Sequence, residues 1–214
     1  MPKINKISIV HSVSRKFENA LKECLKICED CSVEVKEVLS IDDKSIQEKV
    51  LNADCDLVLV IGGDGTIIST IRSLLDLKIP FLGINIGKLG FLTDIDVGSI
   101  SEELPKIISG EYVKEQRPLL EVTPSTNDKK IAVNEVVFHS GTVAKMLNFS
   151  IFQEEKLISK HKSDGVIVSS ATGSSGYFFS GGGPIIYHVY YTHLRAHETP
   201  EHLVIRVEDV KKKR

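Results

Sequence analysis

Residues 56–66, DLVLVIGGDGT, constrain the fold of this chain more than any other segment. An apolar β-type run from Leu57 to Ile61 ends in a turn that contains three glycines, Gly62, Gly63 and Gly65. Because glycine has no side chain, a strand that ends in this way exposes backbone N–H groups to whatever binds there. The pattern predicts a strand, a tight turn and a helix that begins near Thr66.

Asp64 stands among these glycines, where bound phosphates would repel its carboxylate. We therefore expect Asp64 to have a role other than binding anions. The candidate roles are binding a sugar hydroxyl, accepting its proton, or holding a metal ion. The alternative interpretation is structural, with Asp64 capping the helix that follows.

Strand and helix patterns alternate through the first half of the chain. Strands are expected at 6–10, 33–39, 56–61 and 80–84, and helices at 15–31, 45–51, 67–76 and 100–109. Such alternation predicts a parallel sheet wrapped by helices, with ligands bound at the carboxyl ends of its strands. Beyond residues 111–116 the pattern changes to strands at 119–122, 130–138, 147–152 and 157–160 with polar turns between them, which predicts an antiparallel domain.

Composition excludes several classes of function. The 214 residues carry a net charge of −2, so bulk charge gives no indication of nucleic-acid binding. The apolar runs have the length of strands, so no membrane span is expected. The start of the chain lacks the apolar core of a signal peptide, and a cytoplasmic location is expected.

Three cysteines, Cys24, Cys28 and Cys31, have the C-x3-C-x2-C spacing that binds an iron–sulfur cluster in radical S-adenosylmethionine enzymes. A cluster would need these thiols in a loop. Here they share helical spacing with Phe17 and Leu21, so we interpret them as small apolar residues on the buried face of a helix.

Further segments carry polar chemistry. Residues 83–92 form a glycine-punctuated loop after a strand. Asn134 and Glu135 stand inside a strand-like stretch, where they form either a clamp for sugar and base or part of an exposed edge strand. Residues 162–177 run from a strand into serines, threonine and glycines, which admit a planar ligand and its phosphates, and Tyr177 could stack on a ring. The alternative for this array and for residues 180–184 is a flexible linker.

Taken together and in this order, the segments resemble the NAD kinase family. The matches are GGDGT at 62–66, INIGKLGFLTDID at 84–96, NEVV at 134–137 and DGVIVSSATGSSGYFFSGGGPI at 164–185, with the loop RPLLE at 117–121. The resemblance covers residues 5–187, and the joint pattern is more specific than GGDG alone, which phosphofructokinases and diacylglycerol-type lipid kinases share.

The resemblance implies a fold of α/β plus all-β type. A Rossmann-like parallel α/β domain is expected over residues 1–115 and an incomplete antiparallel β-sandwich-type domain over 116–188, followed by an atypical tail over 189–214. The implied reaction transfers the terminal phosphoryl group of ATP, with Mg²⁺ or another divalent cation, to the 2′-hydroxyl of the adenosine ribose of NAD, giving NADP. The family forms dimers and tetramers, so a homo-oligomer is expected, with neither a nucleic acid nor a membrane as partner.

The resemblance also implies roles for individual residues. Asp64 matches the general base, and the phosphate or ATP loop comprises Gly62, Gly63, Gly65 and Thr66. The implied NAD-binding residues are Asp64, Gly65, Asn134, Glu135, Lys145, Lys162, Asp164, Thr172, Ser175, Gly176, Tyr177 and Ser180. Among them Asn134 and Glu135 match the adenosine-side pair, and Asp164 an acid near the nicotinamide end. No protein side chain is assigned to a metal.

Two departures from the family pattern stand out. Residues 170–177 read SATGSSGY where the family has Thr-Pro-Thr-Gly-Ser-Thr-Ala-Tyr, which should loosen the loop. Residues 189–214 show no family pattern, and we hypothesise a foreign segment from a frameshift or cloning junction, solvated or disordered. A metal site at His193, His197 and His202 is the alternative there, although the spacing lacks the glutamate of a zinc-protease helix.

Two competing functions remain open from the sequence. One is a lipid or sphingoid-base kinase that shares GGDGT, against which the polar Asn134–Glu135 pair speaks. The other is a catalytically inactive dinucleotide-binding fragment.

Overall fold

The computed structural model describes residues 1–13, 17–87, 90–126, 128–141, 146–186 and 203–208. The chain divides into two compact units, Met1–Gln116 and Arg117–Arg214, and each is described by itself. No helix among the described residues combines the length and apolar character needed to cross a bilayer.

The first unit is built on a parallel sheet in which an apolar strand occupies the centre. Five strands, β1 (Lys6–His11), β2 (Glu34–Ser40), β3 (Leu57–Gly62), β4 (Phe81–Asn85) and β5 (Ile95–Asp96), are ordered β2-β1-β3-β4-β5. All neighbouring pairs run parallel. Every residue of β3 is buried, as expected for a continuous apolar strand covered on both faces. The predicted parallel sheet is confirmed.

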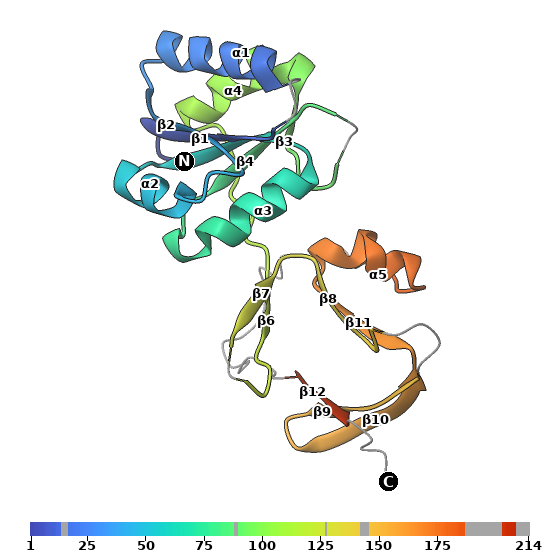
Figure 1. The fold of residues 1–214 in the computed structure, drawn as a ribbon. Coiled ribbons are helices and arrows are strands. Elements are labelled where there is room, and N and C mark those ends of the chain that lie inside the picture. Colours follow the sequence, from blue (N-terminus) through green and yellow to red (C-terminus); the bar gives the residue numbers. More distant parts are fainter. Residues whose placement is uncertain (14–16, 88–89, 127, 142–145, 187–202, 209–214) are drawn as a thin grey trace. The chain divides into compact units, whose positions relative to one another are not determined.

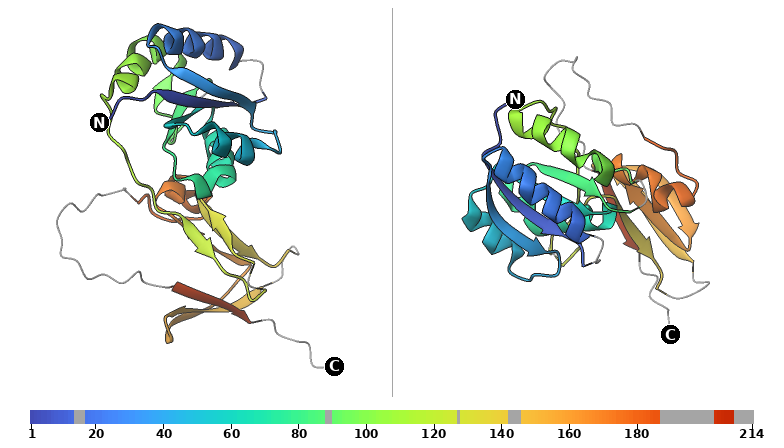
Figure 2. Two further views of the ribbon diagram at one scale, coloured as in Figure 1. Left: turned by 90° about the vertical axis from the view of Figure 1, so that its left-hand side faces the viewer. Right: turned by 90° about the horizontal axis from the view of Figure 1, so that it is seen from above.

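Helices cover both faces of this sheet. The helices α1 (Phe17–Asp30) and α4 (Ile100–Ser109) lie on one face, and α2 (Ile46–Ala53) and α3 (Asp64–Leu74) lie on the other (Figure 1, Figure 2). Two short 3-10 turns, η1 (Leu75–Leu77) and η2 (Val97–Ser99), precede β4 and α4. Each face has its own apolar core, and successive residues of β3 alternate between them: Leu59 joins the core under α1 and α4, and Val60 the core under α2 and α3.

The cysteines of α1 belong to the first of these cores. Cys24 and Cys28 are fully buried, and Cys31 is half-buried just beyond the end of the helix. Burial raises the pKa of the Cys24 thiol to about 12 and that of Cys28 to about 11, so both stay protonated at neutral pH. The interpretation of buried residues on a helix face is confirmed for Cys24 and Cys28, whereas Cys31 lies one residue past the end of the helix.

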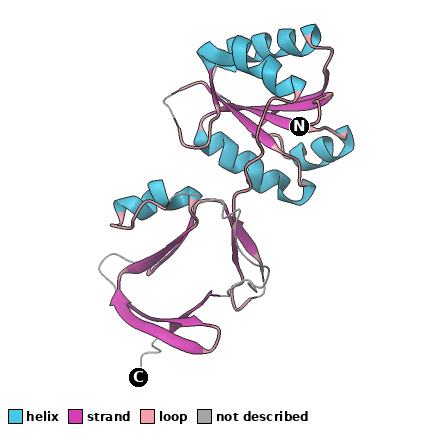
Figure 3. Cartoon of the chain, turned by 180° about the vertical axis from the view of Figure 1, so that it is seen from behind, coloured by secondary structure: helices cyan, strands magenta, loops and turns pink. Residues whose placement is uncertain are grey.

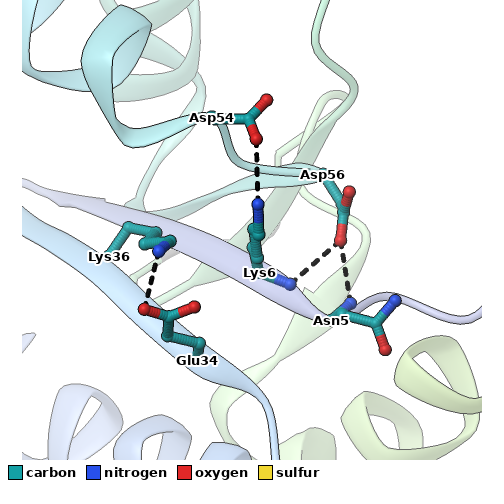
Figure 4. Close-up of polar contacts among 6 residues, drawn as sticks. All are labelled: Asn5, Lys6, Glu34, Lys36, Asp54 and Asp56. Carbon is teal, nitrogen blue, oxygen red and sulfur yellow. Dashed lines mark hydrogen bonds and ion pairs between the residues drawn. The ribbon is translucent and has the colours of Figure 1, made fainter.

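Polar contacts join β1 and β3 where these two strands begin (Figure 4). The glycine turn lies at the opposite end of β3. One carboxylate oxygen of Asp56 accepts the backbone N–H groups of both Asn5 and Lys6 at 2.9 Å. The Lys6 ammonium donates to Asp54 at 2.8 Å. These contacts hold the start of β1 against the start of β3, so the apolar residues that follow pair in register.

The second unit consists of small antiparallel sheets (Figure 3). The strands among its described residues are β6 (Leu120–Val122), β7 (Lys130–Ala132), β8 (Glu135–His139), β9 (Leu147–Gln153), β10 (Lys156–Ser163), β11 (Gly165–Ser169) and β12 (Leu203–Glu208). They form the sheets β10-β9-β12, β11-β8 and β6-β7. A 3-10 turn, η3 (Thr172–Ser175), and a short helix, α5 (Tyr177–Ser180), follow β11. The α/β plus β fold class expected from the sequence is confirmed.

Three local expectations are corrected. The strand expected over 130–138 is two strands, because β7 pairs with β6 while β8 pairs with β11, and the chain bends at Val133 and Asn134 between them. The loop expected around residues 170–180 contains η3 and α5.

The third correction concerns residues 203–208, expected in a solvated or disordered tail, which form β12 and pair antiparallel with β9. Their sequence, LVIRVE, contains three β-branched residues, which favour strands. The histidines at 193, 197 and 202 lie outside the described residues.

Candidate functional site

The glycine turn forms the passage from β3 to α3 at the carboxyl edge of the parallel sheet. Gly63 precedes the helix in an extended conformation, and Asp64 is the first helical residue. A Cβ on Gly62 would lie 2.4 Å from the Thr66 hydroxyl oxygen, so packing requires glycine there. Built onto Gly63 or Gly65, a Cβ would have no described heavy atom within 4 Å apart from its own helix and chain neighbours. These two glycines therefore leave open space beside the first turn of α3.

The Asp64 side chain is held by the loop that follows β4. Its Oδ2 accepts the Phe91 N–H at 2.9 Å, and its Oδ1 accepts the Leu92 N–H at 3.1 Å. The residue at the cap position of α3 is Gly63, and no side-chain cap bond is present there. The interpretation of Asp64 as a helix cap is therefore wrong, because its carboxylate is oriented across the turn toward another segment.

Asn134 stands where the second unit changes sheets. Its carbonyl oxygen accepts the Ser170 N–H at 2.8 Å, and the Ser170 hydroxyl donates to the Val133 carbonyl at 2.7 Å. The same hydroxyl accepts the Gly173 N–H at 3.1 Å. A Cβ on Gly173 would lie 2.2 Å from the Asn134 carbonyl oxygen, so only glycine allows η3 to approach this closely. The hydroxyl-rich array is thus packed against the Asn134–Glu135 pair.

Three residues of this junction each carry a buried polar side-chain atom. Asn134 Oδ1, Glu135 Oε2 and Thr172 Oγ1 have no hydrogen-bond partner among the described residues. Burial raises the pKa of the Glu135 carboxyl. A buried polar group without a partner costs free energy, so this arrangement suits a ligand that brings hydroxyl and amine donors. The burial of these oxygens argues against a simple solvated edge strand.

A cavity of about 530 Å³ lies further along β8 and β11 within the second unit. Asp164 and Tyr177, both singled out by sequence, are among its lining residues. So are His139 and Phe178, which the sequence analysis missed. His139 is two residues beyond Val137, another lining residue, so the period of a strand would have indicated it once β8 was known. The His139 Nδ1 accepts the Gly141 N–H at 3.0 Å.

The remaining residues singled out by sequence are distributed over several elements of the second unit. Gly176 follows η3, and a Cβ there would lie 3.7 Å from Glu135 Oε2. Ser175 is half-buried in η3, and Ser180 is exposed at the end of α5. Lys162 is exposed on β10 and is not among the described residues that line the cavity. Lys145 lies outside the described residues.

A glycine turn at the carboxyl edge of a parallel sheet, and a buried polar cluster in a second, β-rich unit, are features of nucleotide-binding proteins. The family model for the ATP-NAD kinase N-terminal domain matches residues 7–112, and the one for the ATP-NAD kinase C-terminal domain matches residues 133–189. The chain belongs to the NAD kinase family.

Individual relatives agree with this assignment. The NAD kinase of Marinobacter nauticus is 41% identical over 144 residues, which are 65% of this chain and 49% of that protein. The NAD kinase of Clostridium beijerinckii is 39% identical over 190 residues, or 86% of this chain and 66% of that protein. The chain thus spans about half the length of the first of these relatives.

A solved structure supports the fold. The NAD kinase from Archaeoglobus fulgidus in complex with ATP has a TM-score of 0.69 and 24% sequence identity, covering 97% of this chain and 75% of that one. These matches are all to NAD kinases, and none supports the lipid-kinase alternative.

Proposed function

We propose that this chain carries out the reaction of an NAD kinase, transferring the terminal phosphoryl group of ATP to the 2′-hydroxyl of the adenosine ribose of NAD. The observation that carries the proposal is the Asp64 carboxylate, held by the amides of Phe91 and Leu92 beside the open space at Gly63 and Gly65. A carboxylate oriented in this way beside open space at a helix terminus suits deprotonation of an alcohol that attacks a phosphoryl group.

Asp64 is proposed as the general base. A ribose hydroxyl is a weak nucleophile, so a positioned carboxylate must accept its proton as the new P–O bond forms. Each Asp64 oxygen accepts one backbone N–H, and a carboxylate oxygen has room for a second hydrogen bond. The carboxylate therefore remains able to accept a hydroxyl while its orientation is held.

The open glycines are proposed to face phosphates. The first N–H groups of a helix carry no intrahelical bond and lie at its positive end, so they attract anions. Gly63 and Gly65 present such groups without a Cβ in the way. A divalent cation such as Mg²⁺ would arrive with ATP and neutralise its phosphates. The described residues contain no group of three or more His, Cys, Asp or Glu side chains arranged for a metal, so phosphate oxygens would supply most of its ligands.

The second unit is proposed to bind NAD. Glu135 would accept hydrogen bonds from ribose hydroxyls, while Asn134 and Thr172 pair with polar groups of the adenosine half. The Asp164–Tyr177 cavity is proposed for the nicotinamide end, where the ring can stack on the tyrosine. The remaining proposed contacts to the dinucleotide are Lys145, Lys162, Ser175, Gly176 and Ser180.

The test is a comparison of the full chain with Asp64→Asn in the presence of NAD, ATP and Mg²⁺. We expect NADP formation to fall by at least roughly 100-fold in the variant, as for loss of a general base, while NAD binding measured by calorimetry persists. Asp56→Asn is the matched control, because Asp56 also accepts two backbone N–H groups but at the other end of β3.

Near-normal turnover in Asp64→Asn would show the base assignment to be wrong. A wild-type chain that binds NAD without producing NADP would instead be a dinucleotide-binding fragment. The homo-oligomer and the cytoplasmic location expected from the sequence stay predictions, to be checked by sedimentation and by fractionation.

A further inference from the structure

The backbone around Gly90 lies in close contact with the Asp64 carboxylate. A Cβ built on Gly90 would lie 2.1 Å from Asp64 Oδ1, 2.6 Å from Cγ and 2.9 Å from Oδ2. The next two residues, Phe91 and Leu92, donate their N–H groups to that same carboxylate. Three successive residues thus surround one functional side chain, and they do so through the main chain.

The loop that carries these residues is anchored on both sides. Before it, the Gly87 N–H donates to the buried Asn85 side chain at 3.0 Å. After it, the Asp94 N–H donates to the Gly83 carbonyl at 2.9 Å, and the Asp94 carboxylate accepts the Gly83 N–H at 3.1 Å. The Asp94–Gly83 pair therefore fixes the backbone directly after residues 90–92 to β4.

We propose that Gly90 is a positioning residue for the Asp64 carboxylate. Its missing Cβ lets the Phe91 and Leu92 amides reach the two carboxylate oxygens together, which sets the direction in which the remaining lone pairs point. This inference rests on the proposed function, since the importance of that direction depends on Asp64 acting as the base. It assigns to Gly90 a task separate from nucleotide binding.

Substitution of Gly90 by alanine separates this role from a purely structural one. Gly90 has no positive φ, so alanine is compatible with its backbone conformation. The atoms that its Cβ would meet belong to the end of the Asp64 side chain, which can rotate away. Gly90→Ala should therefore displace the carboxylate while leaving the fold intact.

The kinetic experiment compares Gly90→Ala with wild type in the NAD kinase assay on the full chain. We expect kcat to fall about 100-fold, the size of effect that a misplacement of about 1 Å produces, with KM for NAD and ATP within about twofold. Gly98→Ala is the control, because a Cβ there meets no described heavy atom within 4 Å and kcat should not change. An unchanged kcat in Gly90→Ala, or a loss that appears only in KM, overturns the proposal.

Amide hydrogen exchange tests the same geometry without turnover. The Phe91 and Leu92 amides should exchange slowly in wild type and at least about 10-fold faster in both Gly90→Ala and Asp64→Ala, since each removes the acceptor from its place. Melting temperatures within about 2 °C of wild type would confirm that the fold is kept. If exchange at these amides is the same in all three proteins, the positioning role is wrong. If exchange responds but wild type makes no NADP, the proposed function fails while the contact stands.

Discussion

Gly65→Ala should stabilise the free protein and weaken its binding of nucleotide. Gly65 is the second residue of α3, and a Cβ there meets no described heavy atom within 4 Å apart from its own helix and chain neighbours. Packing and backbone conformation therefore do not call for glycine, whose flexibility in a helix costs about 0.5–1 kcal/mol relative to alanine. Because this open position lies in the first turn of α3, where unpaired N–H groups attract anions, we expect a phosphate to approach there.

The magnitudes follow from this geometry. A gain of up to about 1 kcal/mol should raise the melting temperature of the free protein by about 1–4 °C. A phosphate held off the helix terminus by the new methyl group loses a hydrogen bond to a charged group, about 1.5–3 kcal/mol. That loss corresponds to a dissociation constant for ATP that is roughly 10- to 150-fold higher.

The assay is calorimetry for ATP affinity together with melting in the absence and presence of ATP. Gly62→Ala provides the opposite case, because its Cβ would lie 2.4 Å from the Thr66 hydroxyl oxygen and should destabilise by about 1–3 kcal/mol. Gly98→Ala, at an equally open position in the short 3-10 turn η2, should leave the affinity for ATP unchanged. If Gly65→Ala melts lower than wild type, or binds ATP equally well, the open space at Gly65 does not serve a ligand and the argument is refuted.

Three further predictions concern other parts of the chain. Burial raises the pKa of Glu135 above its ordinary 4.5, so the contribution of this group to stability is present below that pH and is lost as the pH rises through the raised value. Glu135→Gln should therefore melt at a higher temperature than wild type at pH 7 and at the same temperature near pH 4. Parallel curves of melting temperature against pH for the two proteins would contradict this. Burial raises the pKa of the Cys24 thiol to about 12 and that of Cys28 to about 11. Both should resist labelling by iodoacetamide at pH 8 until urea unfolds the chain. Rapid labelling of these two residues in the folded protein would contradict their burial. Asp56→Ala should lower the free energy of unfolding, measured in urea, by about 1 kcal/mol, because two backbone N–H groups lose their acceptor. An unchanged midpoint of urea unfolding would show that water replaces the carboxylate fully.

The elements predicted best are those whose sequence pattern is dictated by burial. The helix expected at 100–109 is α4 (Ile100–Ser109), because its apolar residues recur at helical spacing against the core. The apolar run of β3 was likewise recognisable, since all of its residues are buried. The strand expected over 130–138 was wrong in its continuity, because the break at Asn134 is imposed by the partners β6 and β11, which lie elsewhere in the chain.

The sequence indicates side chains of the candidate site, but it does not indicate the backbone N–H groups that hold them. Asp64 and Glu135 were identifiable because a carboxylate among glycines, or inside an apolar strand, contradicts its surroundings. The N–H groups of Phe91 and Leu92 have no such signal, since every residue other than proline carries one. His139 was missed for a related reason, because only the pairing of β8 with β11 places it beside the cavity.

The sequence by itself determined the family, the parallel sheet and the residue types that carry the chemistry, because local spacing encodes which residues are buried and which turns need glycine. The tertiary structure alone shows which groups hold the Asp64 carboxylate. From the glycine turn alone a helix cap is the alternative to a base, and the resemblance of the whole sequence to the NAD kinase family favours the base. The Phe91 N–H, 27 residues further along the chain, donates to the Asp64 carboxylate, so this carboxylate does not cap α3. A long-range hydrogen bond of this kind depends on which strands are neighbours in the sheet, and no pattern within the turn predicts it.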